Sequence, residues 1–390
     1  MKKILFYTSG IGLGGVEKVI LEVLKKIDKT RFDIKLALQY ENENFFEDEI
    51  PKEIKYKYML PQNIINKSLY YRSRKKNIFY KILYSFMLKY EKYIIKKNYL
   101  KFSSDREIVI DFKSGDFLKL ILLNNNKKVC WIHGEITKLN RYQERKIKLR
   151  KQLKKCNKVI CICNEMRDNF LKEMPELEKN VNVIYNPFNV EEIRKKSQDY
   201  KNLSVEEKEM LKNKYIIMVS RLELKMKDFF TLFKAYKIVL KTNPDLKLYI
   251  LGDGKDKEKI LFEIKKMQLG DKIFLLGSKK NPYPWIKNAE MLVHSSKAEG
   301  LPTVLIEGLI LNKIVVATNC LTGPKEILNN GEYGSLVEIG DFYKMAEEII
   351  ELLNPLSSRR NRYLKNLNEK ILRFDNEIII NQIEQMLEKI

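Results

Sequence analysis

Short apolar segments typical of β-strands alternate along the chain with segments of helical periodicity, and this pattern occurs twice. In the first half the strand-like segments are KKILFY, FDIKLALQY, REIVIDF, KVCWIH and KVICIC. In the second half they are YIIMVS, LKLYILG, KIFLLG, EMLVHSS and KIVVATN. Strands that alternate with helices form parallel sheets covered by helices. We therefore predict an α/β protein with two Rossmann-like domains facing each other across a cleft.

The predicted boundary between the two domains lies at VIYNPFN, residues 183–189, where Asn186-Pro187 redirects the chain. This places an N-terminal domain at residues 1–187 and a C-terminal domain at residues 188–373. The segment FDNEIIINQIEQMLEKI, residues 374–390, has the periodicity of an amphipathic helix. We expect this helix to return to the N-terminal domain.

Glycines follow the first predicted strand in the stretch YTSGIGLGGVEKV, where Gly10, Gly12 and Gly15 fit the spacing G-x-G-x-x-G. In a dinucleotide-binding domain such a loop carries the pyrophosphate, and an acidic residue after the second strand binds the ribose. Glu41 stands at about that position. The first domain alone therefore leaves a dehydrogenase open, and the second domain must discriminate.

The composition limits the compartment and the partners. The formal net charge is +23, which favours nucleic acid, an anionic membrane surface or phosphate-bearing substrates as partners. The chain has five cysteines, and this odd number argues against a disulfide framework and for a reducing cytoplasm. No segment has the roughly 18 apolar residues that a bilayer-spanning helix needs. We expect a cytoplasmic protein whose membrane contact is peripheral.

The stretch HSSKAEGLPTVLIEG, residues 294–308, joins a predicted strand to a predicted helix that starts near Pro302. The free N–H groups and the positive dipole end at the start of a helix attract anions, and Gly300 lets a ligand approach the backbone. Glu299 precedes the helix and Glu307 lies in its second turn. A diphosphate at the helix start would place one carboxylate on each side of it.

Two cations and a second glycine turn lie upstream. Arg221 follows a strand in SRLELKMKDFF, and Lys227 lies just before a helix. Both side chains are suited to neutralising phosphate groups. The segment LGDGKDKEKI adds a strand–glycine–helix turn at Gly252 and Gly254. We expect Lys225 and Asp228 to be exposed surface residues.

Together these residues resemble the donor-binding half of glycosyltransferase family 4, which has the GT-B fold. The resemblance rests on Arg221 and Lys227, the Gly252-Asp253-Gly254 turn, the Glu299/Glu307 pair, and the segments TGPKEIL and NPYPWIKNAEMLVHSS. It implies that Arg221 and Lys227 bind the donor diphosphate, that Glu299 orients the transferred sugar and that Glu307 holds the ribose. It also implies that the donor is contacted by Gly300, Leu301, Pro302 and Thr303, with backbone amides as the donors except at Pro302, which has no N–H. It further implies that residues 1–187 form the acceptor-binding domain and residues 188–373 the nucleotide-sugar-binding domain.

The resemblance extends to the first domain. GGVEK, with Gly14 and Gly15, resembles the family's loop that approaches the donor phosphates. His133, in KVCWIHGEI, matches the place where family members often carry an active-site histidine facing the sugar. We interpret the other histidine, His294, as structural. Asp111, Ser114 and Asp116 follow a strand and are candidates for the acceptor side.

Residues 64–101 contain eleven Lys or Arg and a single acidic residue, Glu91. Apolar residues repeat there at helical spacing: Phe79, Ile82, Leu83, Phe86, Met87, Tyr90, Tyr93 and Ile94. The lysines that lie largely off this stripe are Lys81, Lys89, Lys92 and Lys96. This pattern suits an anionic membrane surface or a polyprenyl-diphosphate-linked acceptor. The alternative is an ordinary amphipathic helix that packs its stripe on the sheet.

The resemblance thus implies a retaining hexosyltransferase that moves a hexose or N-acetylhexosamine from a nucleoside diphosphate sugar to a glycan or lipid-linked acceptor. UDP is the expected nucleotide, surface polysaccharide or glycoconjugate synthesis the expected setting, and the inner face of the cell membrane the expected location. We expect no cofactor and no metal, since no Asp-x-Asp pair was found. We expect no nucleic-acid partner. The alternatives are a sugar-nucleotide epimerase of the same architecture and a basic surface binder without transferase activity.

Overall fold

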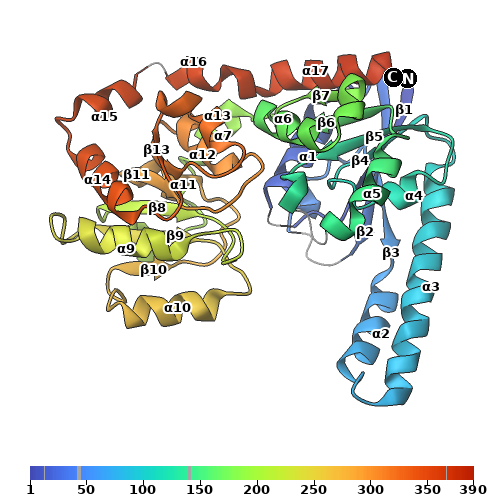
Figure 1. Ribbon diagram of the computed structural model, residues 1–390, viewed down its shortest axis with the longest axis horizontal. Helices are drawn as coiled ribbons and strands as arrows, with labels where there is room; N and C mark the ends of the chain where they lie inside the picture. The colour runs from blue at the N-terminus through green and yellow to red at the C-terminus, as the bar shows by residue number, and fades with distance from the viewer. Residues whose placement is uncertain (13, 42–44, 139–141, 366) are drawn as a thin grey trace. The chain divides into compact units, whose positions relative to one another are not determined.

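The computed structural model describes residues 1–12, 14–41, 45–138, 142–365 and 367–390. These residues form two compact units. Unit 1 comprises Met1–Ile162, Arg167–Pro187 and Ile379–Ile390, and unit 2 comprises Cys163–Met166 and Phe188–Ile378. Each unit contains one parallel sheet with helices packed against it (Figure 1). The predicted α/β class with two Rossmann-like domains is confirmed.

The sheet of unit 1 has seven parallel strands in the order β3-β2-β1-β4-β5-β6-β7. The strands are β1 (Lys2–Thr8), β2 (Phe32–Tyr40), β3 (Lys55–Leu60), β4 (Ile108–Asp111), β5 (Lys127–Ile132), β6 (Lys158–Cys161) and β7 (Val181–Val183). β1 lies in the centre, with Tyr7 paired to Ala37 on one side and to Asp111 on the other. Both faces of this strand are covered, so Ile4, Leu5 and Phe6 are fully buried.

The helices of unit 1 connect these strands. They are α1 (Gly15–Lys26), α2 (Gln62–Ser73), α3 (Ile78–Ser103), α4 (Leu118–Ile121), α5 (Tyr142–Leu153), α6 (Asn164–Glu173) and α17 (Asn376–Lys389). Unit 1 also has three short 3-10 helices, at Glu47–Glu49, Ile136–Lys138 and Pro175–Asn180. A parallel sheet needs such crossovers because each strand must start again at the same edge.

Unit 2 repeats the strand order of a doubly wound sheet, β10-β9-β8-β11-β12-β13. Its strands are β8 (Tyr215–Val219), β9 (Lys247–Leu251), β10 (Ile273–Leu275), β11 (Met291–His294), β12 (Ile314–Thr318) and β13 (Ser335–Val337). One side of the sheet packs on α9, where Phe229, Leu232 and Phe233 are fully buried. The hydrophobic core of unit 2 therefore packs directly against the sheet whose loops carry the predicted donor-binding residues.

The helices of unit 2 are α7 (Val190–Lys196), α8 (Val205–Met210), α9 (Phe229–Val239), α10 (Lys257–Lys266), α11 (Tyr283–Asn288), α12 (Thr303–Ile310), α13 (Pro324–Ile327), α14 (Phe342–Leu353), α15 (Ser358–Tyr363) and α16 (Leu367–Ile371). Two 3-10 helices lie at Asn329–Gly331 and Leu372–Phe374. α12 begins directly after the loop that contains Glu299, as the sequence predicts. Pro302 precedes its first residue and occupies the N-cap position.

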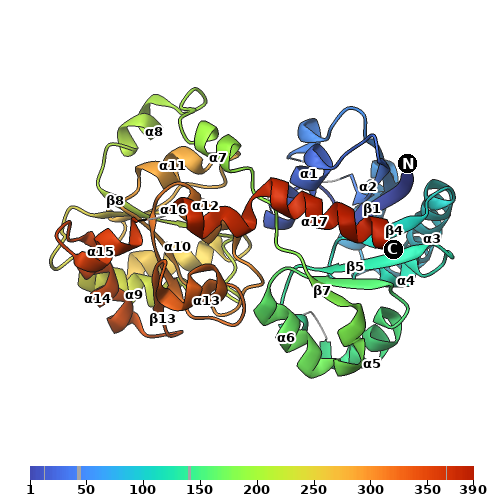
Figure 2. The same cartoon turned by 90° about the horizontal axis from the view of Figure 1, so that it is seen from above.

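The C-terminal helix α17 returns to unit 1, as predicted. The Lys2 ammonium donates to the carbonyl of Leu387 at 3.0 Å, and Arg31 forms an ion pair with Glu384 at 2.7 Å. Ile383 and Leu387 on the same helix are fully buried. The two chain ends consequently lie next to one another in unit 1 (Figure 2).

α2 and α3 pack against each other and form a helical hairpin, residues 62–103, that extends beyond the edge of the unit 1 sheet (Figure 1). The hairpin is anchored at its base, where the Gln62 amide donates to the Glu41 carboxylate at 2.9 Å and Tyr99 is fully buried and stacks on Tyr7 at 5.8 Å. Most of the predicted apolar stripe of α3 does not pack on the sheet. Five of its eight members are exposed: Phe79, Ile82, Phe86, Tyr90 and Tyr93. The expectation of an ordinary packed amphipathic helix is therefore wrong for most of this stripe.

Candidate active site

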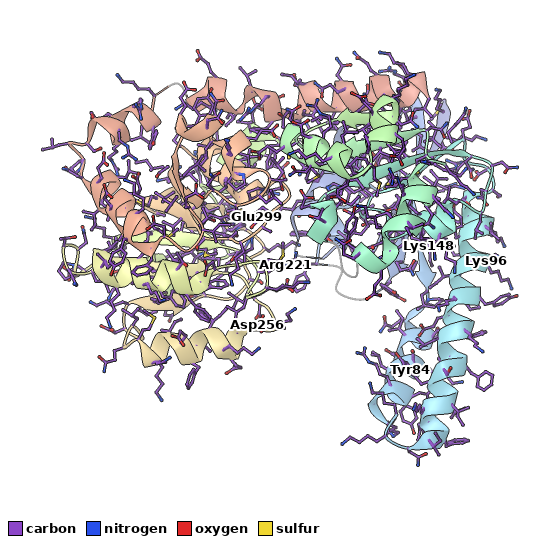
Figure 3. The ribbon with its side chains drawn as sticks, in the orientation of Figure 1. Tyr84, Lys96, Lys148, Arg221, Asp256 and Glu299 are labelled. Atoms are coloured by element: carbon purple, nitrogen blue, oxygen red, sulfur yellow. The ribbon has the colours of Figure 1, made fainter. Side chains whose placement is uncertain are left out.

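The strand order of unit 2 creates a switch point between β8 and β11, because the chain winds in opposite directions from these two neighbours. In open parallel sheets, ligands bind outside the carboxyl ends of the strands at such a point. The loop after β8 carries Arg221 and Lys227, and the loop after β11 carries Glu299. Figure 3 shows Arg221 and Glu299 along the same edge of unit 2.

Close contacts between glycines and a neighbouring loop fix the path of the chain after β8. Gly252 has φ +135°, and a Cβ at this position would lie 1.9 Å from the carbonyl oxygen of Ser220. A Cβ at Gly254 would lie 2.5 Å from the carbonyl oxygen of Leu222. No side chain larger than hydrogen fits at either position. These glycines thus determine where the backbone of Arg221 lies, and the Arg221 side chain is exposed.

Backbone hydrogen bonds join the loop after β8 to the loop after β11. Lys227 and Ser296 form an isolated antiparallel bridge. The amide of Asp228 donates to the carbonyl of Ser295 at 3.0 Å, and the amide of Lys297 donates to the carbonyl of Met226 at 2.8 Å. This short ladder holds Lys227 beside the residues that follow β11, although the two segments are about 70 residues apart in the sequence.

Lys227 and Glu299 meet in a polar cluster beneath these loops. The Lys227 ammonium pairs with Glu299 Oε1, and the two side chains are only 13% and 14% exposed. The same oxygen accepts a hydrogen bond from the Ser296 hydroxyl at 2.6 Å and lies 2.9 Å from His294 Nε2. Three donors therefore converge on one oxygen. Among the described residues, no donor contacts Glu299 Oε2, so that oxygen is available for a ligand hydroxyl.

The cluster holds its carboxyl group ionised. Burial raises the pKa of Glu299, but the charge of Lys227 and the hydrogen bond from His294 outweigh it, so the pKa lies well below its usual range. Burial lowers the pKa of His294, and Lys227 lowers it further. A neutral imidazole with its proton on Nε2 therefore donates to an anionic Glu299. The interpretation of His294 as structural stays a prediction, and the structure adds that its ring contacts Glu299.

The chain after Glu299 leads into the N-terminus of α12 through Gly300, Leu301 and Pro302, and Thr303 is the first residue of the helix. A left-handed glycine supports this loop from below, since a Cβ at Gly323 would lie 2.7 Å from the carbonyl oxygen of Gly300. The loop is thus packed tightly on one side. Its amides are the free N–H groups of a helix start, the kind of site that binds phosphate.

Glu307 lies deeper in unit 2 than the sequence reading implied. It is only 4% exposed, and the Tyr283 hydroxyl donates to its Oε1 at 3.4 Å. Asp228, expected at the surface, is 7% exposed and caps α9 by accepting a hydrogen bond from the backbone amide of Thr231 at 3.4 Å. The Thr231 hydroxyl also donates to this carboxylate, at 2.8 Å. That expectation is wrong because Asp is a preferred N-cap residue, which the sequence reading overlooked. Lys225 is exposed, as expected.

The switch point of unit 1 lies between β1 and β4 and also carries an ion pair. Lys113, after β4, pairs with Glu17 of α1 at 2.9 Å. Gly14 is the N-cap of α1 with an ordinary φ of −127°, and Gly15 is the first helical residue. The Glu17 carboxylate folds back against Gly14, where a Cβ would lie 2.0 Å from Glu17 Oε2. The sequence analysis predicted the glycines of this loop but not the ion pair between Lys113 and Glu17 beside them.

His133 follows β5, and its ring packs 4.5 Å from the ring of Phe112. Neither ring nitrogen has a hydrogen-bond partner among the described residues, and both are shielded from solvent. Burial lowers the pKa of His133 to about 3. The backbone amide of His133 donates to the Ser114 hydroxyl at 2.9 Å. The imidazole is therefore neutral at physiological pH, and its two ring nitrogens are buried polar atoms without a partner among the described residues.

Asp111 ends β4 and is fully buried. It accepts hydrogen bonds from the amides of Lys113 at 2.9 Å and Phe117 at 2.8 Å. Burial raises its pKa to about 7. Asp111 thus shapes the loop that carries Lys113 and Ser114, while Asp116 is exposed on the same loop.

Other features lie away from these switch points. A pocket of about 710 Å³ in unit 1 is lined by Lys2, Ile108 and Lys127, which stand at the amino ends of their strands. That is the opposite edge of the sheet from the predicted site residues. The described residues contain no cluster of His, Cys, Asp or Glu suited to holding a metal ion. All five cysteines are buried, as expected for thiols that fill the core.

Comparison with known proteins connects this geometry to a chemistry. Residues 199–369 match the family model of glycosyl transferases group 1, and this region lies inside unit 2. An uncharacterized glycosyltransferase of Methanocaldococcus jannaschii is 29% identical over 63% of each chain. The N-acetylgalactosamine-N,N'-diacetylbacillosaminyl-diphospho-undecaprenol 4-alpha-N-acetylgalactosaminyltransferase of Campylobacter jejuni is 34% identical over 50% of each chain. The chain thus spans between half and two thirds of these two relatives.

Among solved structures, HepE of Anabaena in complex with UDP and glucose superposes with a TM-score of 0.78. The superposition covers 100% of each chain at 17% sequence identity. This likeness shows the fold, and it confirms the predicted GT-B architecture. The family match, the relatives and the fold together support a glycosyltransferase of the GT-B fold, whose matched region holds the Lys227–Glu299 pair.

Proposed function

We propose that this chain is a retaining, metal-independent glycosyltransferase of family 4. The donor is a UDP-linked hexose or N-acetylhexosamine, and the acceptor is a hydroxyl group on a glycan or lipid-linked saccharide. One observation carries the proposal: a buried carboxylate, Glu299, held by Lys227 directly before the N-terminus of α12. Three features of a sugar nucleotide, its diphosphate, its sugar hydroxyls and its leaving-group charge, each find a complementary group there.

The diphosphate is the first of these features. The N–H groups at the start of α12 and the exposed guanidinium of Arg221 supply donors and positive charge. Lys227 adds a second cation, whose charge is shared with Glu299. By resemblance to the family, the amides of Gly300 to Thr303 contact the diphosphate or the sugar, and Glu307 holds the ribose. The Anabaena relative of the same fold that contains UDP and glucose supports UDP as the nucleotide.

The sugar hydroxyls are the second feature. Three donors saturate Glu299 Oε1, whereas Oε2 is open, so this oxygen can accept a hydrogen bond from the transferred sugar. A carboxylate that stays ionised is a strong acceptor. In unit 1, His133 is neutral, so it contributes a hydrogen bond and not a charge. Family resemblance assigns this bond to the same sugar.

In the proposed reaction, the bond between the anomeric carbon and the diphosphate oxygen breaks as the acceptor oxygen attacks from the same face. The acceptor proton moves to the departing diphosphate oxygen, and the new glycosidic bond keeps the anomeric configuration. The enzyme accelerates this step by positioning both substrates and by stabilising the negative charge on the leaving group. Arg221, Lys227 and the dipole of α12 perform the second task without a metal ion.

For the acceptor, we propose a polyprenyl-diphosphate-linked saccharide in the synthesis of a bacterial surface polysaccharide or glycoconjugate. The Campylobacter relative acts on an undecaprenol-linked saccharide according to its name, which supports this class. Such an acceptor places the enzyme at the inner face of the cell membrane as a peripheral protein. No helix in the described part of the chain has the length and apolar character needed to span a bilayer.

The experiment that tests the proposal is thermal stabilisation by UDP, GDP, ADP, NAD, UDP-glucose, UDP-galactose and the two UDP-N-acetylhexosamines. A nucleotide that binds the folded state alone raises the melting temperature in proportion to the logarithm of its concentration over Kd. We expect a shift with UDP and with one UDP-sugar, lost in Lys227→Met. A rise in melting temperature with NAD alone would instead indicate a dehydrogenase. Conversion of one UDP-hexose to its epimer would indicate an epimerase.

A further inference from the structure

The α2–α3 hairpin, residues 62–103, exposes far more apolar surface than a solvent-facing helix pair needs. α3 alone has 26 residues, and only Met87, Tyr99 and Ser103 along it are buried. The large apolar side chains exposed on the hairpin are Leu69, Tyr70, Ile78, Phe79, Ile82, Phe86, Leu88, Tyr90 and Tyr93. Phe86 is 62% exposed and Ile78 is 69% exposed. So many exposed large apolar side chains on one helical hairpin favour an interaction surface.

The same hairpin is strongly and uniformly basic. It contains eleven cationic residues, Lys67, Arg72, Arg74, Lys75, Lys76, Lys81, Lys89, Lys92, Lys96, Lys97 and Lys101. All eleven side chains are exposed, and none forms an ion pair with another described residue. Glu91 is the single acid, so the hairpin has a net charge of 11 − 1 = +10, out of +23 for the whole chain. Such a charge excess favours association with an anionic partner.

Cations and aromatic rings are interleaved on this surface and not separated into two faces. The Arg74 guanidinium lies 3.8 Å from the centre of the Tyr70 ring, and the Lys89 ammonium lies 5.8 Å from that of Phe86. Figure 3 labels Tyr84 in the outer half of α3 and Lys96 nearer the sheet. Long cationic side chains beside rings suit the boundary between headgroups and acyl chains, where amines reach phosphates and rings enter the apolar layer.

Two other partners fit the hairpin less well. A second copy would bring another +10 of charge against the first, which opposes association through this surface. A nucleic acid would satisfy the cations and stack on rings, but it would leave aliphatic side chains such as Ile78 and Ile82 in water. An anionic bilayer is the one partner that satisfies both the charge and the aliphatic surface.

We propose that the α2–α3 hairpin is a membrane-docking element that binds anionic phospholipid bilayers through its exposed rings, aliphatic side chains and lysines. This proposal rests on the proposed function and adds the structural element and the lipid class that bring the enzyme to a lipid-linked acceptor. The lipid test below does not depend on the donor site. A failure of the nucleotide experiment and a failure of the vesicle experiment are therefore separate results.

The test uses a fluorescent reporter placed in the hairpin of the full chain. Both native tryptophans, Trp131 and Trp285, are fully buried, so a Phe86→Trp variant adds the only exposed indole. The variant is mixed with vesicles of phosphatidylcholine alone or with 30% phosphatidylglycerol. We expect a blue shift of the added emission and co-sedimentation with the anionic vesicles only, both weakened by added salt. Equal binding to neutral vesicles, or no binding to either kind, would overturn the proposal.

Matched variants in unit 2 control for charge and for apolar exposure. Lys81, Lys89 and Lys92 are changed together to Glu, and the control reverses Lys259, Lys265 and Lys266 on α10, which are also exposed. Phe86→Ser is compared with Phe262→Ser, since Phe262 on α10 is 69% exposed. The hairpin variants should lower the vesicle partition coefficient at least tenfold, and the α10 variants less than threefold. All four should keep the UDP-induced thermal shift of the wild type.

Two outcomes would identify a different partner and refute the bilayer. The first is a dimer in solution that becomes a monomer in Phe86→Ser. The second is binding to single-stranded RNA that is tighter than binding to anionic vesicles and is lost in the same hairpin variants. Equal losses in hairpin and α10 variants would show a non-specific attraction of the whole basic chain, and this also contradicts the proposal.

Discussion

The two sheets of this molecule have the same strand order around β1 and β8, yet their switch points are equipped differently. Each is crossed by a Lys–Glu pair, Lys113–Glu17 in unit 1 and Lys227–Glu299 in unit 2. In unit 2 the glutamate also receives Ser296 and His294, whereas in unit 1 the glutamate folds over Gly14. The same scaffold thus carries a cluster of converging donors in one unit and a simpler ion pair in the other.

The difference teaches that fold alone does not locate the chemistry. In unit 2, the cluster around Glu299 is held in place by the backbone bridge between Lys227 and Ser296 and by the helix that starts after Glu299. These features keep the carboxylate charged and oriented, which a switch point by itself does not ensure. In the proposed enzyme, the donor therefore binds to unit 2 at the cluster around Glu299.

The largest expected effect separates the two lysines. Lys227→Met should lower kcat/KM for the UDP-sugar by about 100- to 1,000-fold, because a cation that stabilises the leaving group is lost. Lys113→Met should lower it less than tenfold. The measurement is UDP release at subsaturating donor, with melting temperatures to verify that both variants fold. Equal losses in the two variants would break the contrast between the switch points.

The next effect separates two glycines. Gly252→Ala should destabilise the protein by about 3 kcal/mol, because φ is +135° and the new Cβ would overlap the Ser220 carbonyl. Gly14→Ala should cost less than about 1 kcal/mol, since it meets only the mobile end of Glu17. Urea denaturation gives both values, with Gly270→Ala as a control that has open space around the Cβ. A tolerated Gly252→Ala would refute the account of how Arg221 is placed.

The third effect concerns pH and has opposite signs in the two units. Burial raises the pKa of Asp111 from 3.8 to about 7, so its stabilising contribution is complete below pH 3.8 and is lost as pH rises through 7. The pKa of Glu299 lies below its ordinary value of 4.5, so its contribution is present above pH 4.5 and is lost as pH falls.

This sign difference is measured as the free energy of unfolding between pH 4 and pH 8. The advantage of wild type over Asp111→Asn should shrink by about 2 kcal/mol as pH rises, roughly half the limit set by the pKa shift. The advantage of wild type over Glu299→Gln should instead shrink as pH falls from 5 to 4. Parallel curves for the two variants would show that the two carboxyl groups have similar environments.

The smallest effect concerns the two histidines. His294→Asn removes a donor from Glu299, so kcat should fall about tenfold, as for other residues that orient a functional group. The pKa of Glu299 should rise, which moves the acidic limb of the kcat profile to higher pH. His133→Asn should leave that limb in place, because the pKa of Glu299 is lowered by Lys227 and His294. A lower kcat with an unchanged pH profile would show that His294 only packs against its neighbours and does not act through Glu299.

The sequence predicted the fold well, because the alternation of strands and helices is local and repeats twice. The motifs of unit 2 could also be recognised in the sequence, since Arg221, Lys227 and Glu299 lie in strand-to-helix loops that follow neighbouring strands, β8 and β11. The predicted return of the C-terminal helix followed from its apolar periodicity. In each case the information lies in short, continuous stretches of chain.

Other features could not be predicted because they depend on distant segments. The ion pair of Lys113 with Glu17 joins residues nearly 100 positions apart, and neither residue stands out in its own stretch. His294 and Ser296 are two residues apart at the end of β11, a spacing that places both side chains on one face, yet Glu299 had to fold back to meet them. The exposure of the α3 stripe depends on where the hairpin leaves the sheet, and periodicity does not report this.

The central claim is that the donor diphosphate binds at the switch point of unit 2, and a crystal structure of the complex with UDP tests it most directly. We predict phosphate oxygens within hydrogen-bond distance of Lys227 Nζ, the Arg221 guanidinium and the amides at the start of α12, with Glu299 Oε2 facing the open sugar position. UDP bound against Gly14 and Lys113 of unit 1, without contact to Lys227 or α12, would contradict the account.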